Sequence, residues 1–333
     1  MRVTRVEFTH RYPMSMVRDL CAVGTFPRHH LWGADALEAA GFAVEYGLFG
    51  RDRRALRALS FRLGDRFGDL EQQVAMARRA DADTVLYAGE ATVLRGLLAA
   101  RTRLPTVAVV HRAAPWVARL DVAVCLSSRV RDALVARHGR DPARTPLAAW
   151  GPDLAFAGYA ATGDDLVVSA GKTERDTRTL LAALAGTRIP ARVYGGGSST
   201  DTAEVVPVAG QAPLDYAPVL ADLRRASVVA IPLHPSDRLL GLTEINDALA
   251  LGKPIVMTRT AAIDFDPEAV GCGLTVAAGD VAGWRAALTR LAGDAELRAA
   301  MGARGRAFAE AGYNSAAFGA VVVDAIAAAA DQP

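Results

Sequence analysis

The sequence predicts an α/β protein with two doubly wound parallel sheets, one in each half of the chain. Short β-rich runs alternate with helical patterns from end to end, as in stacked βαβ units. The chain has 333 residues, which suits two domains of about 150 residues each. Hydrophobic residues make up 51% and charged residues 22%, a globular composition that excludes disordered and collagen-like chains.

The first half, residues 1–150, is predicted to form one Rossmann-like domain. A segment of 23 residues after its first strand, residues 10–32, is rich in ring side chains and is predicted to be a long functional loop. The predicted strands are 3–8, 43–48, 84–88, 106–111, 122–126 and 146–149. The predicted helices lie near 32–40, 54–79, 92–101 and 129–138.

The second half is predicted to form a second Rossmann-like domain. Residues 151–165 are small, polar and rich in Gly, so we expect a linker there. The domain is predicted to span 166–312, and a helix within 313–333 to pack back on the first domain. The predicted strands are 166–170, 191–194, 228–232, 254–257 and 273–276. The predicted helices are 178–185, 215–226, 244–251, 281–291 and a tract from 295 to 330 broken near 312.

Charge and cysteine usage narrow the class of protein. Residues 1–150 hold 23 of the 38 Lys and Arg but 15 of the 36 Asp and Glu, so the first half is basic and the second acidic. Three scattered cysteines suit a reducing compartment and no zinc site. No signal peptide or membrane span is apparent, so we expect a soluble cytoplasmic protein. Lys172 and Lys253 are the only lysines.

Residues 231–260 contain the most informative segment. A buried strand is followed by a loop and then by a helix that we expect to begin near Thr243, with Thr243 as its cap. Gly241 lets the backbone approach a ligand, and the amides of Leu242, Thr243 and Glu244 would point toward it. A phosphate is the group that such a helix start holds best.

This segment resembles the donor-site motif of retaining glycosyltransferases of the GT-B fold, family 4. Residues 247–254, Asp-Ala-Leu-Ala-Leu-Gly-Lys-Pro, match the second half of that motif. The resemblance implies that Asp247 binds the ribose hydroxyls of a nucleotide. The family's first acidic residue would fall on Leu239, so Asp237 or Glu244 is expected to replace it.

The resemblance continues through residues 167–181, which match the loop where two cations bind the donor diphosphate. It places Lys172 and Arg175 at those cations, after Gly171, and Val208 in the loop that brackets the base. Two cations after a strand end would neutralise the charge on a departing diphosphate. Further stretches in the family's order are 121–128, 145–156, 194–197, 206–211 and 269–280.

The first half is less similar to the family. His111 ends a predicted strand and matches a histidine that the family places at the catalytic site. Residues 10–32 are interpreted as part of the acceptor pocket, with His29, His30 and Trp32 as candidates. The neighbouring histidines do not predict a metal site, because adjacent residues at a helix start do not face one ion and no carboxylate or cysteine is spaced to join them.

Together these features predict a metal-independent glycosyltransferase that needs no cofactor. The resemblance implies transfer from a nucleoside diphosphate sugar, UDP first and GDP next, with retention of configuration, to a small-molecule, natural-product or lipid acceptor. The first domain would bind the acceptor and the second the nucleotide sugar, facing across a cleft. The sequence does not identify the sugar, the acceptor or the oligomeric state.

Alternatives stay open at this point. An epimerase or phosphorylase has the same fold, and a non-catalytic relative would explain the missing first acidic residue. Residues 51–66 form a basic amphipathic stretch that predicts either peripheral membrane contact or a packed helix with a solvated face. Nucleic-acid binding is not predicted, because the basic half has no recognisable binding module.

Overall fold

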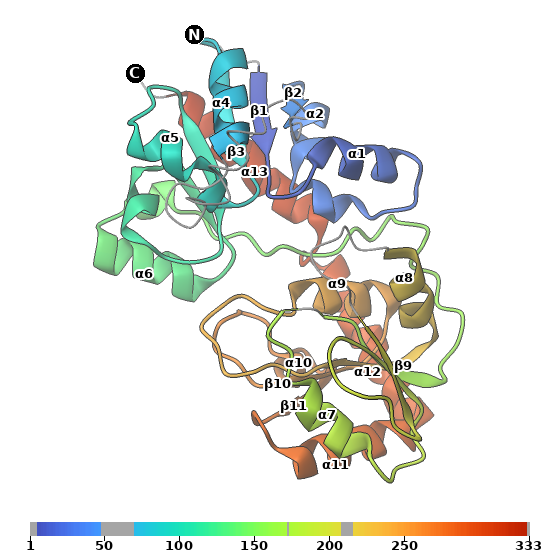
Figure 1. Ribbon diagram of the computed structural model, residues 1–333. Coiled ribbons are helices and arrows are strands. Elements are labelled where there is room, and N and C mark those ends of the chain that lie inside the picture. The colour runs from blue at the N-terminus through green and yellow to red at the C-terminus, as the bar shows by residue number, and fades with distance from the viewer. Residues whose placement is uncertain (1–4, 48–69, 172, 208–215, 332–333) are drawn as a thin grey trace. The chain divides into compact units, whose positions relative to one another are not determined.

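The computed structural model describes residues 5–47, 70–171, 173–207 and 216–331. The chain divides into two compact units, which are described separately (Figure 1). The first unit comprises Met1–Trp150 and Ser315–Pro333, and the second comprises Gly151–Asn314. Each unit contains one parallel sheet with helices packed against it, so the predicted fold class is confirmed.

The sheet of the first unit has five parallel strands in the order β2-β1-β3-β4-β5. Because β2 lies on one side of β1 and β3 on the other, the strand order reverses between β1 and β3. In open α/β sheets, ligands bind at the carboxyl ends of the strands beside such a reversal. The strands are β1 (Arg5–Thr9), β2 (Ala43–Tyr46), β3 (Thr84–Ala88), β4 (Thr106–Val110) and β5 (Val122–Cys125).

The last helix of the chain, α13 (Ser315–Ala330), belongs to this first unit. It packs against β3, β4 and β5 and beside α2 (Ala34–Ala39), so the chain returns to its first sheet after the second unit (Figure 1). The other helices of this unit are α1 (Met14–Ala22), η1 (Arg28–Leu31), α4 (Leu70–Arg79), η2 (Ala91–Leu94), α5 (Arg95–Ala99), η3 (Pro115–Arg119), α6 (Ser128–His138) and η4 (Pro142–Arg144).

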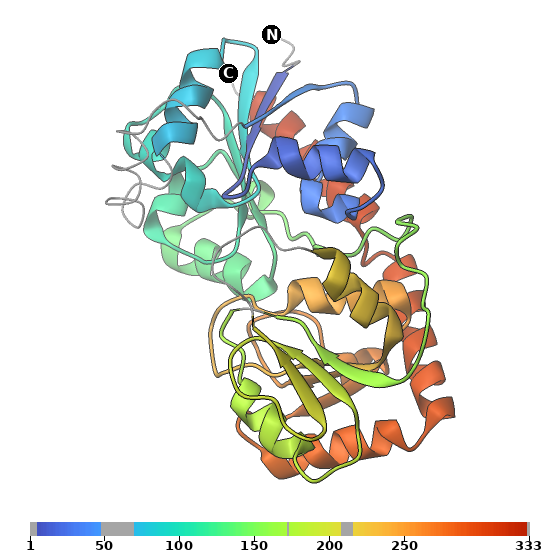
Figure 2. The ribbon, with the colours of Figure 1, turned by 45° about the vertical axis from the view of Figure 1, so that its right-hand side comes forward.

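The sheet of the second unit has six parallel strands in the order β11-β10-β9-β6-β7-β8 (Figure 2). The order reverses between β6 and β9, which marks a second edge where ligands are expected. The strands are β6 (Leu166–Ser169), β7 (Ala191–Tyr194), β8 (Ala203–Val206), β9 (Ala226–Ile231), β10 (Ile255–Thr258) and β11 (Gly273–Val276).

Helices cover the second sheet and bury an aliphatic core. On one side, α7 and α11 pack together over strands of the sheet, with Leu180, Val228 and Trp284 in a core whose members are almost fully buried. Elsewhere α8 packs on β6 and β9, and α9 contacts both α8 and α12. The helices are α7 (Thr177–Leu184), α8 (Tyr216–Arg225), α9 (Leu242–Leu251), α10 (Pro267–Val270), α11 (Val281–Ala292) and α12 (Ala295–Glu310).

Three expectations of local structure were wrong. Residues 10–32 are not one loop, because they contain α1 and η1. Residues 146–149 form no strand, only a single bridge between Cys125 and Leu147, because the chain passes the outer strand β5 once and leaves it. The short strand β8 at the edge of the second sheet was not predicted. Residues 151–165 contain no helix or strand and lie within the second unit.

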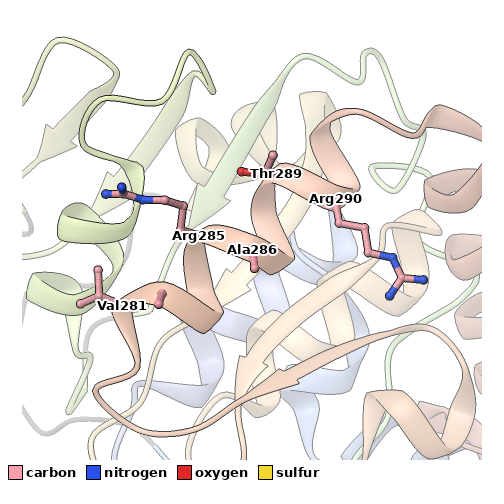
Figure 3. Close-up of a pocket in the computed structure, with 6 residues that line it drawn as sticks. Val281, Arg285, Ala286, Thr289 and Arg290 are labelled. Carbon is pink, nitrogen blue, oxygen red and sulfur yellow. The ribbon is translucent and has the colours of Figure 1, made fainter.

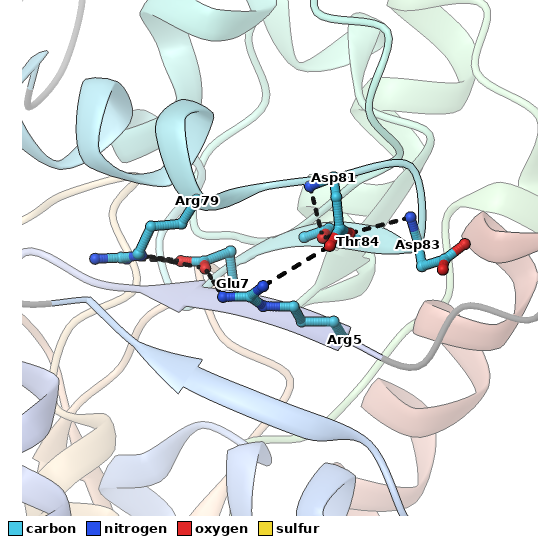
Figure 4. Close-up of polar contacts among 6 residues, drawn as sticks. All are labelled: Arg5, Glu7, Arg79, Asp81, Asp83 and Thr84. Atoms are coloured by element: carbon cyan, nitrogen blue, oxygen red, sulfur yellow. Dashed lines mark hydrogen bonds and ion pairs between the residues drawn. The ribbon is translucent and has the colours of Figure 1, made fainter.

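A buried carboxylate ties β1 to the end of α4 (Figure 4). The side chain of Glu7 is 0% exposed, and Arg79 binds it through two nitrogens, Nε at 3.0 Å and a terminal nitrogen at 2.6 Å from Oε2. Arg5 adds a longer contact to Oε1 at 3.4 Å. A buried charge is tolerated only when it is paired, so this ion pair anchors α4 to the sheet.

Among the described residues, one helical tract, Ala295–Ala330, is long and apolar enough by composition to cross a membrane. The structure divides this tract into α12 and α13, separated by residues 311–314. The second of these helices buries Phe318, Val322 and Ile326 in the first unit. Packing against the sheet thus accounts for its apolar composition.

Candidate functional site

The reversal in the second sheet brings together an arginine and a glutamate that sequence analysis named separately. Arg175 follows β6, and Glu244 lies in the first turn of α9. Their side chains form an ion pair and both are only 6% exposed. Arg175 Nε donates to Glu244 Oε1 at 3.0 Å, and a terminal nitrogen donates to the same oxygen. The pair therefore joins the loop after β6 to the start of α9.

Gly171 is the residue over which this ion pair lies. A Cβ atom at position 171 would be 1.9 Å from Arg175 Nε and 2.0 Å from Glu244 Oε1. No other residue type could stand here without displacing the pair. The absence of a side chain at Gly171 therefore lets the Arg175–Glu244 pair lie close against the backbone after β6, and the donor-binding role of Gly171 stays a prediction.

The arginine keeps unused hydrogen-bond donors. A guanidinium group has five N–H donors, and the observed bonds to Glu244 Oε1 and to the Thr173 carbonyl oxygen use three of them. The other two are free to bind an anion in the structure as described. Arg175 can therefore contact a phosphate without leaving Glu244.

The start of α9 differs from the expectation in one detail. The helix begins at Leu242, one residue earlier than predicted, and its N-cap is Gly241 in the left-handed region with φ 87°. No side chain caps it, so Thr243 is a first-turn residue and not the cap. The first-turn amides of Leu242, Thr243 and Glu244 have no preceding helical carbonyl to bind, which leaves them facing outward from the helix start.

The structure distinguishes the two candidates for the missing acidic residue by their surroundings. Glu244 is 5% exposed and binds Arg175, whereas Asp237 is exposed on the loop before α9. That loop is tied instead through Arg238, which pairs with Glu174. Hydrogen bonds from Ser236 and Arg238 lower the pKa of Glu174. Among the described residues, Glu244 is the carboxylate that meets the predicted diphosphate-binding arginine.

Asp247 lies one turn further along α9 and is 1% exposed. Two tyrosine hydroxyls donate to its Oδ1 atom, each at 2.7 Å: Tyr159 from the segment after residue 150, and Tyr216 from α8. Burial raises the pKa of Asp247 from 3.8 to about 7, although both hydroxyl bonds act in the opposite direction. Neither tyrosine was predicted from the sequence, because their hydroxyls come from segments that match no motif.

Lys253, the lysine of the predicted motif, has a structural role. It is 7% exposed, and its Nζ donates to the Gly163 carbonyl oxygen at 2.7 Å. Three predictions lie outside the described residues: Lys172 as a diphosphate-binding cation, Val208 near the base, and the amphipathic stretch 51–66.

In the first unit, two histidines follow strands on either side of the reversal. His10 follows β1 and His111 follows β4, while Gly89 follows β3 between them. A Cβ atom at position 89 would lie 2.6 Å from His10 Cδ2 and 3.1 Å from Trp32 Cγ, so Gly89 makes room for both rings. His10 was not predicted, although its position after a strand is the signal that identified His111.

Burial keeps both imidazoles neutral. It lowers the pKa of His10 to about 3, with further lowering by His111, Arg11 and His30. Burial also lowers the pKa of His111, against a smaller opposing effect of Glu90. The His111 Nδ1 atom is buried with no hydrogen-bond partner among the described residues. His10 Nδ1 accepts from the Tyr12 amide at 3.3 Å, which places the proton of the neutral ring on Nε2.

The three residues predicted to bind an acceptor, His29, His30 and Trp32, are buried or half-buried and pack beside these histidines. Trp32 is 7% exposed and stacks on Trp150, with ring centroids 4.5 Å apart and an angle of 9°. His29 is 1% exposed, and its carbonyl oxygen accepts from Trp150 Nε1 at 2.9 Å. His30 contacts both His29 and Trp150. Their burial makes them supports for the site more than its exposed surface.

A shallow hollow on the outer side of α11 lies apart from these residues (Figure 3). Val281, Arg285, Ala286 and Thr289 line it, and no predicted site residue does. Arg285 donates to the carbonyl oxygens of Ala182, Ala183 and Ala185 at the end of α7, which gives it a helix-capping role. Within the described ranges, no three His, Cys, Asp or Glu side chains gather where they could hold a metal ion.

Comparisons with known proteins agree on the fold. No protein-family model matches the sequence, and no curated protein matches it. Among solved structures, the chain is similar to sucrose-phosphate synthase from Thermosynechococcus elongatus, with TM-score 0.71 and 14% identity over 97% of this chain and 98% of that one. It is similar to Anabaena HepE in complex with UDP-glucose, with TM-score 0.65 and 13% identity over 97% and 99%. A glycosyltransferase from Rickettsia africae has TM-score 0.65 and 8% identity, and both chains are fully covered. At these identities the likeness establishes the two-domain fold of such proteins.

Proposed function

We propose that this protein transfers a sugar from a nucleoside diphosphate sugar to an acceptor hydroxyl, with retention of configuration. The observation that carries the proposal is the Arg175–Glu244 pair above Gly171, at the reversal of the second sheet and at the start of α9. Two free guanidinium donors and the outward amides of a helix start suit a diphosphate. Lys172 is expected to add a second cation.

The similar HepE structure supports a uridine donor, because that protein was crystallised with UDP-glucose. We infer that the second unit binds UDP-sugar, with GDP-sugar as the second choice, and that Asp247 accepts hydrogen bonds from the ribose. Tyr159 and Tyr216 occupy one oxygen of that carboxylate, so ribose binding would use the other oxygen or replace one tyrosine.

In the proposed reaction, the bond between the sugar C1 atom and the diphosphate oxygen breaks, and a bond from C1 to the acceptor oxygen forms on the same face. The acceptor proton passes to the departing diphosphate. Arg175 and Lys172 stabilise the charge that develops there, which is the main electrostatic contribution. We further propose that the first unit binds the acceptor, with His111 contacting the reacting groups as a neutral ring.

Calorimetric titration of UDP, GDP, ADP and dTDP, with and without EDTA, tests the donor site. Binding at a hundredfold excess over Kd should also stabilise the fold by about 2.7 kcal/mol. Arg175→Gln should weaken binding at least about tenfold, since one charge-assisted contact is lost. The control is Arg178→Gln, an exposed arginine one turn away on α7, which should leave binding unchanged.

Absence of binding by all four nucleotides would refute the proposal and favour a non-catalytic relative. Equal effects of the two arginine substitutions would mean that the diphosphate site has been misplaced. Once a donor and an acceptor are known, the anomeric coupling constant of the product, measured by NMR, decides between retention and inversion.

A further inference from the structure

Helix α1 and the residues that flank it expose an apolar stripe that the proposed reaction does not yet use. Tyr12, Met16, Leu20 and Val23 are exposed by 63%, 37%, 36% and 71%. Met16, Leu20 and the C-cap residue Val23 are spaced four and three residues apart, which places them on one side of the helix, and Tyr12 precedes the helix by two residues. Within the described part of the chain, Leu147 is the one other large apolar side chain exposed to this degree.

The opposite side of α1 already packs in the first unit. Met14, Val17 and Cys21 are buried there, so the stripe is not needed to hold the helix in place. Exposed apolar side chains that are gathered in one patch mark a binding surface, whereas single scattered ones are a normal feature of protein surfaces.

The stripe is continuous with the histidines at the reversal of the first sheet. The Tyr12 ring stacks on His10, with centroids 4.9 Å apart and an angle of 12°. His10 in turn stacks on Trp32, with centroids 5.3 Å apart, and Trp32 contacts His111 edge to face at 5.5 Å. A chain of ring contacts thus connects Tyr12 of the stripe, through His10 and Trp32, to His111.

Charge along the stripe is balanced. Arg18 pairs with its neighbour Asp19 at 3.1 Å, and Arg11 pairs with Glu90 at 2.8 Å. Both arginines beside the stripe are thus neutralised by carboxylates of this chain. Because these two arginines are already paired within the chain, an uncharged apolar group matches the stripe in charge as well as in hydrophobicity.

We propose that the acceptor is an amphipathic molecule whose hydroxyl lies at His10 and His111 and whose uncharged apolar part lies along Tyr12, Met16 and Leu20. This inference rests on the proposed function and names the class of acceptor for that site. The nine residues of α1 span about 13 Å, which sets the length of the apolar part that the helix can cover.

Binding of the uncharged fluorophore N-phenyl-1-naphthylamine to the full chain tests the stripe. The double variant Met16→Ser, Leu20→Ser should bind it at least about tenfold more weakly than the parent, because two apolar contacts are lost. The matched control is Leu147→Ser, which removes an apolar side chain of similar exposure, 39%, elsewhere in the same unit. That variant should bind within about twofold of the parent.

The hydroxyl end is tested by displacement of the fluorophore with 1-decanol. His111→Ala should weaken displacement by 1-decanol several-fold while leaving the fluorophore affinity unchanged. A charged competitor of equal chain length, decyl sulfate, should displace no better than the alcohol. Equal fluorophore affinity in the parent and the double variant would overturn the proposal, as would stronger displacement by the sulfate.

Two further measurements identify other occupants. If the parent floats with phosphatidylcholine or phosphatidylglycerol vesicles and the double variant does not, the stripe is a membrane contact. If the parent dimerises in sedimentation velocity and the double variant does not, the occupant is a second copy. Either result overturns the acceptor proposal. Calorimetry with UDP distinguishes failure of the acceptor proposal from failure of the proposed function. If the chain binds the fluorophore at the stripe but binds no nucleotide, both the proposed transferase activity and the proposed acceptor are overturned.

Discussion

The buried carboxyl group of Asp247 makes the stability of the second unit depend on pH in a predictable direction. Its pKa is about 7 in the folded chain and 3.8 as the reference for the unfolded chain. Between these values the folded state holds a proton that the unfolded state has released. Stability from this group is therefore fully present below about pH 4 and is lost as the pH rises through about 7.

The size of this effect follows from the shift. A difference of about 3 pKa units corresponds to about 4 kcal/mol in total, and between pH 5 and pH 8 the linkage relation gives a loss of about 2–3 kcal/mol. Asp247→Asn removes the titration while keeping an oxygen that can accept from Tyr159 and Tyr216. The free energy of unfolding of the Asn variant, relative to the parent, should thus rise by about 2–3 kcal/mol from pH 5 to pH 8.

Urea denaturation at pH 5, 6, 7 and 8 measures both proteins, and subtraction removes the titrations that they share. Tyr159→Phe is a second variant that should shift the pH at which the stability is lost. It deletes a hydrogen bond that lowers the pKa of Asp247, so the loss of stability should move to higher pH. A difference between parent and Asn variant that stays constant from pH 5 to pH 8 would refute the reasoning, because Asp247 would then be ionised throughout.

Three further predictions concern other parts of the chain. Glu7→Gln should lower the free energy of unfolding, measured in urea, by about 3 kcal/mol, because Arg79 loses a buried partner. The control Glu204→Gln, at an exposed ion pair, should change it by less than about 1 kcal/mol. Equal effects of the two substitutions would contradict the anchoring role of the Glu7–Arg79 pair. Gly89→Ala should cost about 1–3 kcal/mol by crowding the rings beside it, while the glycine at 196, which has open space around it, should tolerate alanine with little change in melting temperature. Lys172→Ala should abolish transfer with the circular dichroism spectrum unchanged, and turnover within a few-fold of the parent would place the diphosphate elsewhere.

The fold was predictable because parallel sheets leave a strong pattern. Strands such as Thr84–Ala88 and Ala191–Tyr194 are short runs rich in β-branched and aromatic residues between helical patterns, and their bounds were predicted without error. Helix α1 was missed because it is apolar on two sides. Met14 and Val17 face the core while Met16 and Leu20 face outward beside Arg18 and Asp19, so apolar side chains interrupt the polar side and weaken the helical period.

The candidate site residues that could be predicted from the sequence are those whose positions follow from the ends of strands and the start of a helix. Gly171, Gly241 and Arg175 follow strands or precede a helix, and such positions can be located from local sequence alone. The contacts that set the chemistry join distant segments: Tyr159 meets Asp247 across 88 residues, and Arg175 meets Glu244 across 69. Tyr159 lies in no predicted motif, and Arg175 and Glu244 were predicted separately, so the pairing of these residues needed the tertiary structure.

The two sheets place their unusual polar groups by the same rule. In the first sheet the order reverses between β1 and β3, where His10 and Gly89 follow the strands. In the second it reverses between β6 and β9, where Gly171 follows β6 and Arg175 bridges to Leu233 just after β9. At each reversal the helices on either side diverge, which leaves the carboxyl ends of two strands uncovered. A glycine beside a charged or ring side chain lies at both edges, and the donor and the acceptor that we propose would each bind at one of them.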